Sequence, residues 1–136
     1  MKERLMALDY GEKRIGVAIS DPLGITAQPY PFISNDDNKS KEISKLIEMY
    51  DITTLYIGLP KDTRTGGLTK KAEEVQRFKD QLAKTVSIHI EFFDERRSTM
   101  AARDQLREVG IKAKKQKGII DSQAAAFMLQ GVLDRT

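Results

Sequence analysis

Apolar runs of β-type residues along the chain predict five strands. Two short runs, Arg4 to Leu8 and Arg14 to Ser20, flank a glycine-containing turn and predict a β-hairpin. A third strand is predicted over Gly24 to Ile33, where two prolines favour a sheet edge because proline cannot donate a ladder hydrogen bond. The remaining strands are predicted at Ile52 to Ile57 and Ser87 to Phe93.

Apolar residues at every third or fourth position predict helices between and after these strands. The predicted helices are Lys41 to Tyr50, Leu68 to Leu82, Met100 to Val109 and Ile119 to Leu133. The order is therefore βββαβαβαα. Because parallel crossovers are right-handed and need covering layers, this order predicts an α/β fold, with a mixed five-stranded sheet flanked by helices on both faces.

Length and composition narrow the class of protein. A chain of 136 residues has the size of one domain, so residues 1–136 are predicted to form a single domain. With no cysteine and one histidine, any metal must be bound mainly by oxygen. No apolar run approaches the roughly 18 residues of a membrane span, and the N-terminus lacks the features of a signal peptide. We therefore expect a cytoplasmic protein with no membrane partner.

Basic residues point weakly to a polyanionic partner. The formal net charge is +3, a value that ordinary proteins also show. A denser group of lysines lies between the last two predicted helices and comprises Lys112, Lys114, Lys115 and Lys117. Such a run is usually solvated surface, but near a catalytic site it would also bind phosphates. We favour the binding role.

Asp9 is the first candidate for chemistry, because it directly follows the apolar run that ends at Leu8. Two interpretations stay open. Asp followed by Gly11 is typical of a hairpin turn, so Asp9 would simply begin the connection. Alternatively, the end of a central strand is rigid enough to hold a metal ligand in place.

Two further acidic positions lie at predicted element ends. Asp94 and Glu95 follow a strand, where alternation directs only one of the two towards a given face, and spacing does not decide which. Ser98 or Thr99 would cap the next helix or contact phosphate. Asp121 opens the last helix, where an acid also interacts favourably with the helix dipole.

An α/β sheet can bring these distant acids together at one edge. Oxygen-only ligands suit Mg²⁺ or Mn²⁺, and two such ions about 4 Å apart support phosphodiester cleavage. The sequence thus predicts a carboxylate site for divalent metal. His89 lies in an apolar strand and is predicted to be a packed or edge residue rather than a base.

Four segments, in this order, resemble the YqgF/RuvX family, and together they cover nearly the whole chain. The segments are Leu8 to Asp21, Ile57 to Pro60, Asp94 to Thr99 and Asp121 to Ala125. Each is weak alone, but four in order are specific. One departure follows Pro60, where the family usually has an asparagine-containing, glycine-rich loop and this chain has Lys61 to Gly67.

The resemblance implies a ribonuclease H-like fold and nuclease activity, since the family is described as Holliday junction resolvases and as nucleases maturing pre-16S ribosomal RNA. It implies that Asp9, Glu95 and Asp121 are the metal-binding catalytic acids, and so selects Glu95 over Asp94. It also implies that a set of basic residues approaches the nucleic acid backbone, namely Lys13, Arg14, Arg96 and Arg97. Lys114, Lys115 and Lys117 join this set from the lysine run.

Three function classes follow. The leading hypothesis is a metal-dependent endonuclease that acts on ribosomal RNA precursor or on branched DNA. The RNA role is favoured, and with it the small ribosomal subunit as a partner. A second is a fragment of a sugar-kinase or actin-like ATPase, against which the short chain argues because those enzymes use two domains. A third is a catalytically silent nucleic-acid-binding factor. The chain is expected to be a monomer or homodimer.

Overall fold

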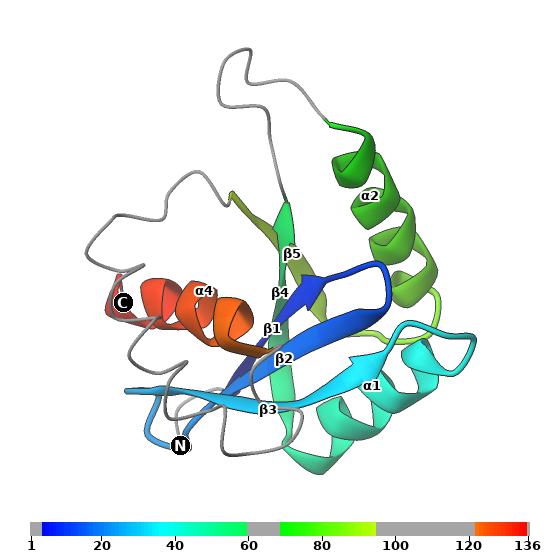
Figure 1. Ribbon diagram of the computed structural model, residues 1–136. Helices are drawn as coiled ribbons and strands as arrows, with labels where there is room; N and C mark the ends of the chain where they lie inside the picture. The colour runs from blue at the N-terminus through cyan, green and yellow to red at the C-terminus, as the bar shows by residue number, and fades with distance from the viewer. Residues whose placement is uncertain (1–3, 60–68, 95–121, 136) are drawn as a thin grey trace.

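The computed structural model describes residues 4–59, 69–94 and 122–135, and its elements form a sheet with helices on both sides (Figure 1). In chain order the elements are β1 (Arg4–Tyr10), β2 (Arg14–Ser20), β3 (Ala27–Ser34), α1 (Lys39–Met49), β4 (Ile52–Leu59), α2 (Lys70–Ala83), β5 (His89–Asp94) and α4 (Gln123–Asp134).

The sheet is mixed, as predicted, with strand order β3-β2-β1-β4-β5. β1, β2 and β3 form an antiparallel meander because short turns connect them. β4 pairs with β1 in parallel after the chain returns through α1, and β5 pairs with β4 in parallel after the crossover through α2. The meander and the crossovers therefore meet at β1, which is the central strand.

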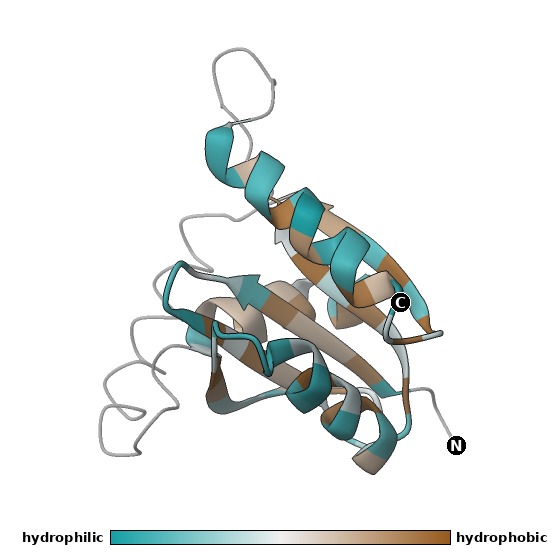
Figure 2. Ribbon diagram, turned by 90° about the vertical axis from the view of Figure 1, so that its right-hand side faces the viewer, coloured by the Kyte–Doolittle hydropathy of each residue, from teal (hydrophilic) through white to brown (hydrophobic). Residues whose placement is uncertain are grey.

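Each face of the sheet buries its own apolar cluster. Met6, Leu8 and Ile57 face one side, where they pack with Val75 and Phe78 of α2 and with α1 residues. Figure 2, viewed from the side of these two helices, shows hydrophilic residues along their outer surfaces. On the opposite face, the small strand residues Ala7 and Ala18 lie under α4. The apolar surface of α4 includes Ala125, Leu129 and Val132. Helices on both faces are thus confirmed.

Most predicted boundaries agree with the structure to within three residues. The predicted strand at residues 14–20 matches β2 in full, and the predicted helix at residues 68–82 corresponds to α2. The helix predicted at residues 100–109 lies outside the described residues. Among the helices described, none is both long and apolar enough to cross a membrane.

α4 is tied to the edge strand β3 by a side chain as well as by apolar packing. The Gln130 Oε1 atom accepts a hydrogen bond from the backbone N–H of Ala27 at 2.9 Å, and its Nε2 donates to the carbonyl of Ile25 at 3.0 Å. Towards the other edge, the ring of Phe93 on β5 lies under Gly131. α4 therefore spans the sheet from β3 to β5.

Asp51 joins α1 to β4 in a conformation that favours glycine, with φ of 53°. Asp tolerates this region better than most residues, but its Cβ still opposes it. We expect Asp51→Gly to stabilise the fold by about 0.5–1 kcal/mol, and Asp51→Ala to give no gain. Thermal unfolding of the three proteins checks this, and a lower Tm for Asp51→Gly would contradict it.

Candidate active site

The carboxyl ends of three parallel strands lie along one edge of the sheet. β1, β4 and β5 share direction, with Leu8 paired to Ile57 and Leu59 paired to Asp94. Neighbouring strands lie about 4.8 Å apart, so the ends of β1 and β5 are separated by roughly 10 Å. Side chains reaching inward from these two strands can therefore approach one group above β4.

Asp9 belongs to the ladder of β1, so the interpretation that it begins the hairpin turn is wrong. It pairs with Gly16 of β2, and Tyr10 still pairs with Ile15 after it. The strand continues because these two pairs complete the antiparallel ladder, and the turn starts only at Gly11. Alternation puts Asp9 on the same face as Ala7, which is the face that α4 covers.

Asp9 is half-buried. Burial raises its pKa above the usual value of 3.8, and the positive charge of Lys71 partly opposes that rise. No side chain among residues 4–59, 69–94 and 122–135 donates a hydrogen bond to it or forms an ion pair with it. A half-buried carboxylate with no donor among the described side chains is suited to a cation.

Ser122, the residue after Asp121 in the chain, is fixed to the sheet close to Asp9. Its Oγ accepts a hydrogen bond from the backbone N–H of Val17 at 2.9 Å and donates one to the carbonyl of Tyr30. Val17 and Tyr30 are cross-strand partners, so the hydroxyl bridges a gap in the β2–β3 ladder. The residue directly before α4 is therefore held beside Gly16, the partner of Asp9.

The gap that Ser122 fills comes from an irregularity in β3. The ladder steps from Ile15 to Val17 on β2 while it steps from Ile33 to Tyr30 on β3, which leaves one extra residue on the edge strand. Pro31 lies within that step and has no N–H to donate. A side-chain hydroxyl thus replaces the missing strand-to-strand contact.

The β1–β2 turn presents Lys13 at the same edge of the sheet. Gly11 is required there, because a Cβ at this position would lie 2.4 Å from the carbonyl oxygen of Arg14. Asn35 braces the turn: its Nδ2 donates to the carbonyl of Gly11 at 2.8 Å, and its N–H donates to that of Lys13 at 2.9 Å. The guanidinium of Arg14 lies 5.2 Å from the ring centre of Phe32. Lys13 and Arg14, both predicted to contact nucleic acid, are exposed.

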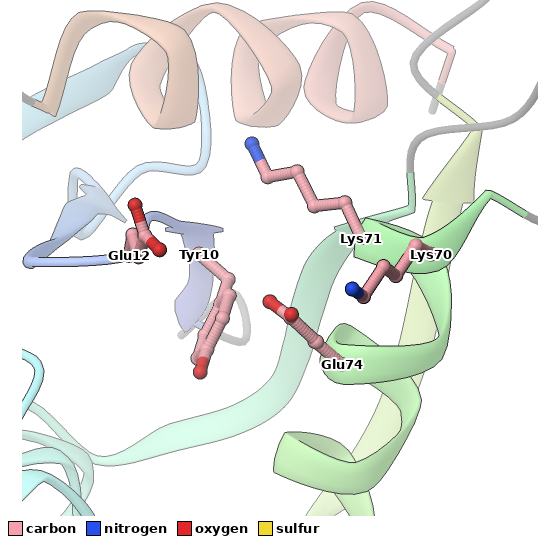
Figure 3. Close-up of a pocket in the computed structure, with 5 residues that line it drawn as sticks. All are labelled: Tyr10, Glu12, Lys70, Lys71 and Glu74. Atoms are coloured by element: carbon pink, nitrogen blue, oxygen red, sulfur yellow. The ribbon is translucent and has the colours of Figure 1, made fainter.

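A pocket of about 410 Å³ opens beside β1, between the hairpin and the start of α2 (Figure 3). Its lining comprises Tyr10, Glu12, Lys70, Lys71 and Glu74. The two lysines were not among the predicted site residues. The crossover pattern contains a signal for them, because the helix that follows a parallel strand begins at the carboxyl edge of the sheet.

The other predicted site residues lie outside the described residues. They are Glu95, Arg96, Arg97, Lys114, Lys115, Lys117 and Asp121. Within the described part of the chain, no three acids, histidines or cysteines form a metal-binding group, since two of the three predicted ligands fall outside it. His89 is exposed on the edge strand β5, which agrees with its predicted edge position. Its Nε2 lies 3.1 Å from Oε1 of Glu91.

The sheet order and its helices define a ribonuclease H-like fold. RuvC of T. thermophilus in complex with a Holliday junction substrate shares this fold, with a TM-score of 0.58, 9% identity, and coverage of 98% of this chain and 97% of that one. The fowlpox virus Holliday junction resolvase has a TM-score of 0.57, 13% identity, and coverage of 98% and 99%. The predicted fold is confirmed.

Sequence comparison identifies the family. The model of the family RuvX, described as Holliday junction resolvase, matches residues 3–135. A protein of Ruminiclostridium cellulolyticum is 39% identical over 135 residues, 97% of this chain and 94% of that protein, and one of Halothermothrix orenii is 41% identical over 133 residues, 96% and 94%. Both carry the name "Putative pre-16S rRNA nuclease". The chain belongs to the RuvX family, which confirms the predicted family and the predicted enzyme class, a nuclease.

Proposed function

We propose that this protein is a metal-dependent endonuclease that cuts phosphodiester bonds in structured nucleic acid, with Asp9, Glu95 and Asp121 as its catalytic acids. The half-buried carboxylate of Asp9, to which no described side chain donates a hydrogen bond, carries the proposal. Two further observations support it. β5 ends at Asp94, directly before Glu95, and Ser122, directly after Asp121, is hydrogen-bonded next to the partner of Asp9.

The residues fit an oxygen-preferring cation. The chain has no cysteine, and the described surroundings of Asp9 supply no hydrogen-bond donor that would compete with a metal. Mg²⁺ or Mn²⁺ prefers such carboxylate ligands. When bound, the metal would activate water and stabilise the leaving oxygen of the phosphodiester.

The chain's own groups then have distinct tasks. Asp9 lies on the central strand, where its own pairing with Gly16 of β2 and the pairing of the preceding Leu8 with Ile57 of β4 hold its backbone rigid. Lys13 lies on the braced turn at the same edge and would bind a phosphate of the backbone, with Arg14 at the start of β2 beside it. Arg96 and Arg97 are proposed to continue this contact, together with Lys114, Lys115 and Lys117 of the lysine run.

The precursor of 16S ribosomal RNA is the proposed substrate, and it would be met in association with the small ribosomal subunit. The names of the relatives at 39% and 41% identity favour it. A four-way DNA junction is the second candidate, because the family model carries that description.

A cleavage assay with both substrates tests the proposal. Purified protein is incubated with end-labelled 16S precursor RNA or with a synthetic four-way junction, in Mg²⁺, Mn²⁺ or EDTA, and Asp9→Asn controls for contaminating nucleases. We expect metal-dependent cutting of the RNA that the variant lacks. Cutting of the junction alone would favour the second substrate, whereas tight binding without cutting of either would favour a silent binding factor.

A further inference from the structure

Lys71, in the first turn of α2, lies at the edge of the sheet that carries Asp9. Figure 3 shows its side chain extending away from Lys70 and Glu74, in the direction of α4, whereas those two side chains point into the pocket beside Tyr10. The side chain is exposed, and its charge acts on Asp9. Among the described residues, Lys71 is therefore the cation whose charge influences Asp9, the proposed metal ligand.

The two charges interact without forming an ion pair. No N···O distance of 4.0 Å or less joins Lys71 to Asp9 or to any other acid among the described residues. A lysine that served only to neutralise Asp9 would gain most from direct contact. The charged atoms of the two side chains are more than 4.0 Å apart, farther than an ion pair requires.

The position of Lys71 is also unfavourable for the helix that carries it. Thr69 caps α2 by accepting a hydrogen bond from the N–H of Ala72 at 3.0 Å, so Lys70 and Lys71 occupy the first turn. Positive charges there oppose the helix dipole. An anion bound at this end would reverse the sign of that effect.

We propose that Lys71 binds a substrate phosphate next to the bond that is cut. This inference rests on the proposed function and adds a residue to it. A divalent cation at Asp9 and the ammonium of Lys71 repel each other, and a phosphate between them attracts both. Lys13 on the hairpin and Lys71 on α2 then contact the nucleic acid backbone from two sides of Asp9.

Binding without cleavage tests this assignment. Affinity for fluorescent 16S precursor RNA and for a four-way junction is measured in EDTA over a range of salt, in an Asp9→Asn parent and in the parent carrying Lys71→Ala, Lys71→Arg or Lys84→Ala. Lys84 is the control because it lies at the opposite end of the same helix. We expect Lys71→Ala to weaken binding roughly three- to tenfold and to reduce the log-log salt slope by about 0.7–0.9. Lys71→Arg should retain the contact.

The outcomes separate this inference from the proposed function. Equal Kd values and salt slopes for Lys71→Ala and Lys84→Ala would overturn the role of Lys71, even if the wild-type protein cuts. A lower Tm for Lys71→Ala with unchanged binding would make Lys71 a structural partner of Asp9 and would also overturn it. Absence of both binding and cutting by the wild-type protein would overturn the two proposals together.

Discussion

Ser122→Ala is expected to destabilise the protein by about 2–4 kcal/mol and to lower its cleavage rate by roughly 100-fold. The stability loss follows because the hydroxyl satisfies two backbone groups, the buried N–H of Val17 and the partly buried carbonyl of Tyr30. Each group left unpaired costs about 1–3 kcal/mol. The rate loss follows because Ser122 adjoins Asp121, and a displacement of about 1 Å in a catalytic group can cost 10²-fold.

Ser20 provides a matched control. Its side chain is also fully buried on β2, and its Oγ accepts a hydrogen bond from the N–H of Leu5 at 2.8 Å. It lies at the end of β2 away from Gly16, the residue paired with Asp9. Ser20→Ala should therefore lose stability, by about 1–2 kcal/mol, without losing activity.

The measurements are urea unfolding for stability and single-turnover cleavage below the unfolding transition for activity. A metal titration adds a readout that general destabilisation does not move, since displacement of Asp121 should weaken Mn²⁺ binding while Ser20→Ala leaves it unchanged. If both serine variants cleave at the wild-type rate when folded, Ser122 holds the fold but does not position the site.

The alternation of side chains was enough to predict most of the strands. β2 was predicted with its observed bounds, because its apolar residues lie between a polar turn and Ser20. The start of β3 was predicted three residues early. There, Asp21 Oδ1 accepts hydrogen bonds from the N–H groups of Ile25 and Thr26 and closes a turn up to the strand. A side chain that bonds its own neighbouring backbone competes with the ladder, and apolar patterning does not record this competition.

The site was harder to predict because its geometry depends on contacts between distant segments. Asp9 could be proposed as an acid at a strand end, but the ladder pair with Gly16 was needed to exclude the turn. Ser122 has the sequence context of an ordinary helix N-cap, yet its side chain makes no cap hydrogen bond and bridges two strands instead. Its role depends on the irregular register beside Pro31, which no local pattern reveals.

Lys71 illustrates a second limit. Along the sequence it is one of many exposed lysines on an amphipathic helix, where charge is usually only solvated surface. The crossover from β4 brings the first turn of α2 to the edge where Asp9 lies, so position in the fold distinguishes Lys71 from Lys84. Topology therefore supports the role proposed for Lys71, which composition alone did not suggest.

Asp9→Asn is expected to stabilise the metal-free protein while abolishing cleavage. Burial raises the pKa of Asp9 in the folded state, so the folded protein holds this proton more tightly than the unfolded chain does. Stability from this group is fully present below the unfolded pKa near 3.8 and is lost as pH rises through the folded value. At neutral pH the buried charge is therefore destabilising, and asparagine removes it at little change in volume.

The expected gain is about 1 kcal/mol, or roughly 3–6 °C in Tm, at pH 7, and it should vanish in acid where Asp9 is protonated. Asp80→Asn is the control, because Asp80 is exposed on α2. Thermal unfolding of the three proteins from pH 3 to pH 8 checks the sign. If Asp9→Asn is less stable than the wild type at pH 7, a partner within the protein stabilises the Asp9 carboxylate, and the site is not an unpaired ligand for a cation.

Metal should reverse the order of stability. At a concentration 100 times its Kd, Mn²⁺ or Mg²⁺ would stabilise the wild-type protein and Asp80→Asn by about 2.7 kcal/mol. Asp9→Asn should lose this increment together with about 10³-fold or more of the cleavage rate, because an amide is a neutral and weaker ligand. Equal metal stabilisation of Asp9→Asn and wild type would place the cation elsewhere. A crossover between the two stability curves on adding metal would mean that the charge which costs the apo fold stability is the charge that the cation binds.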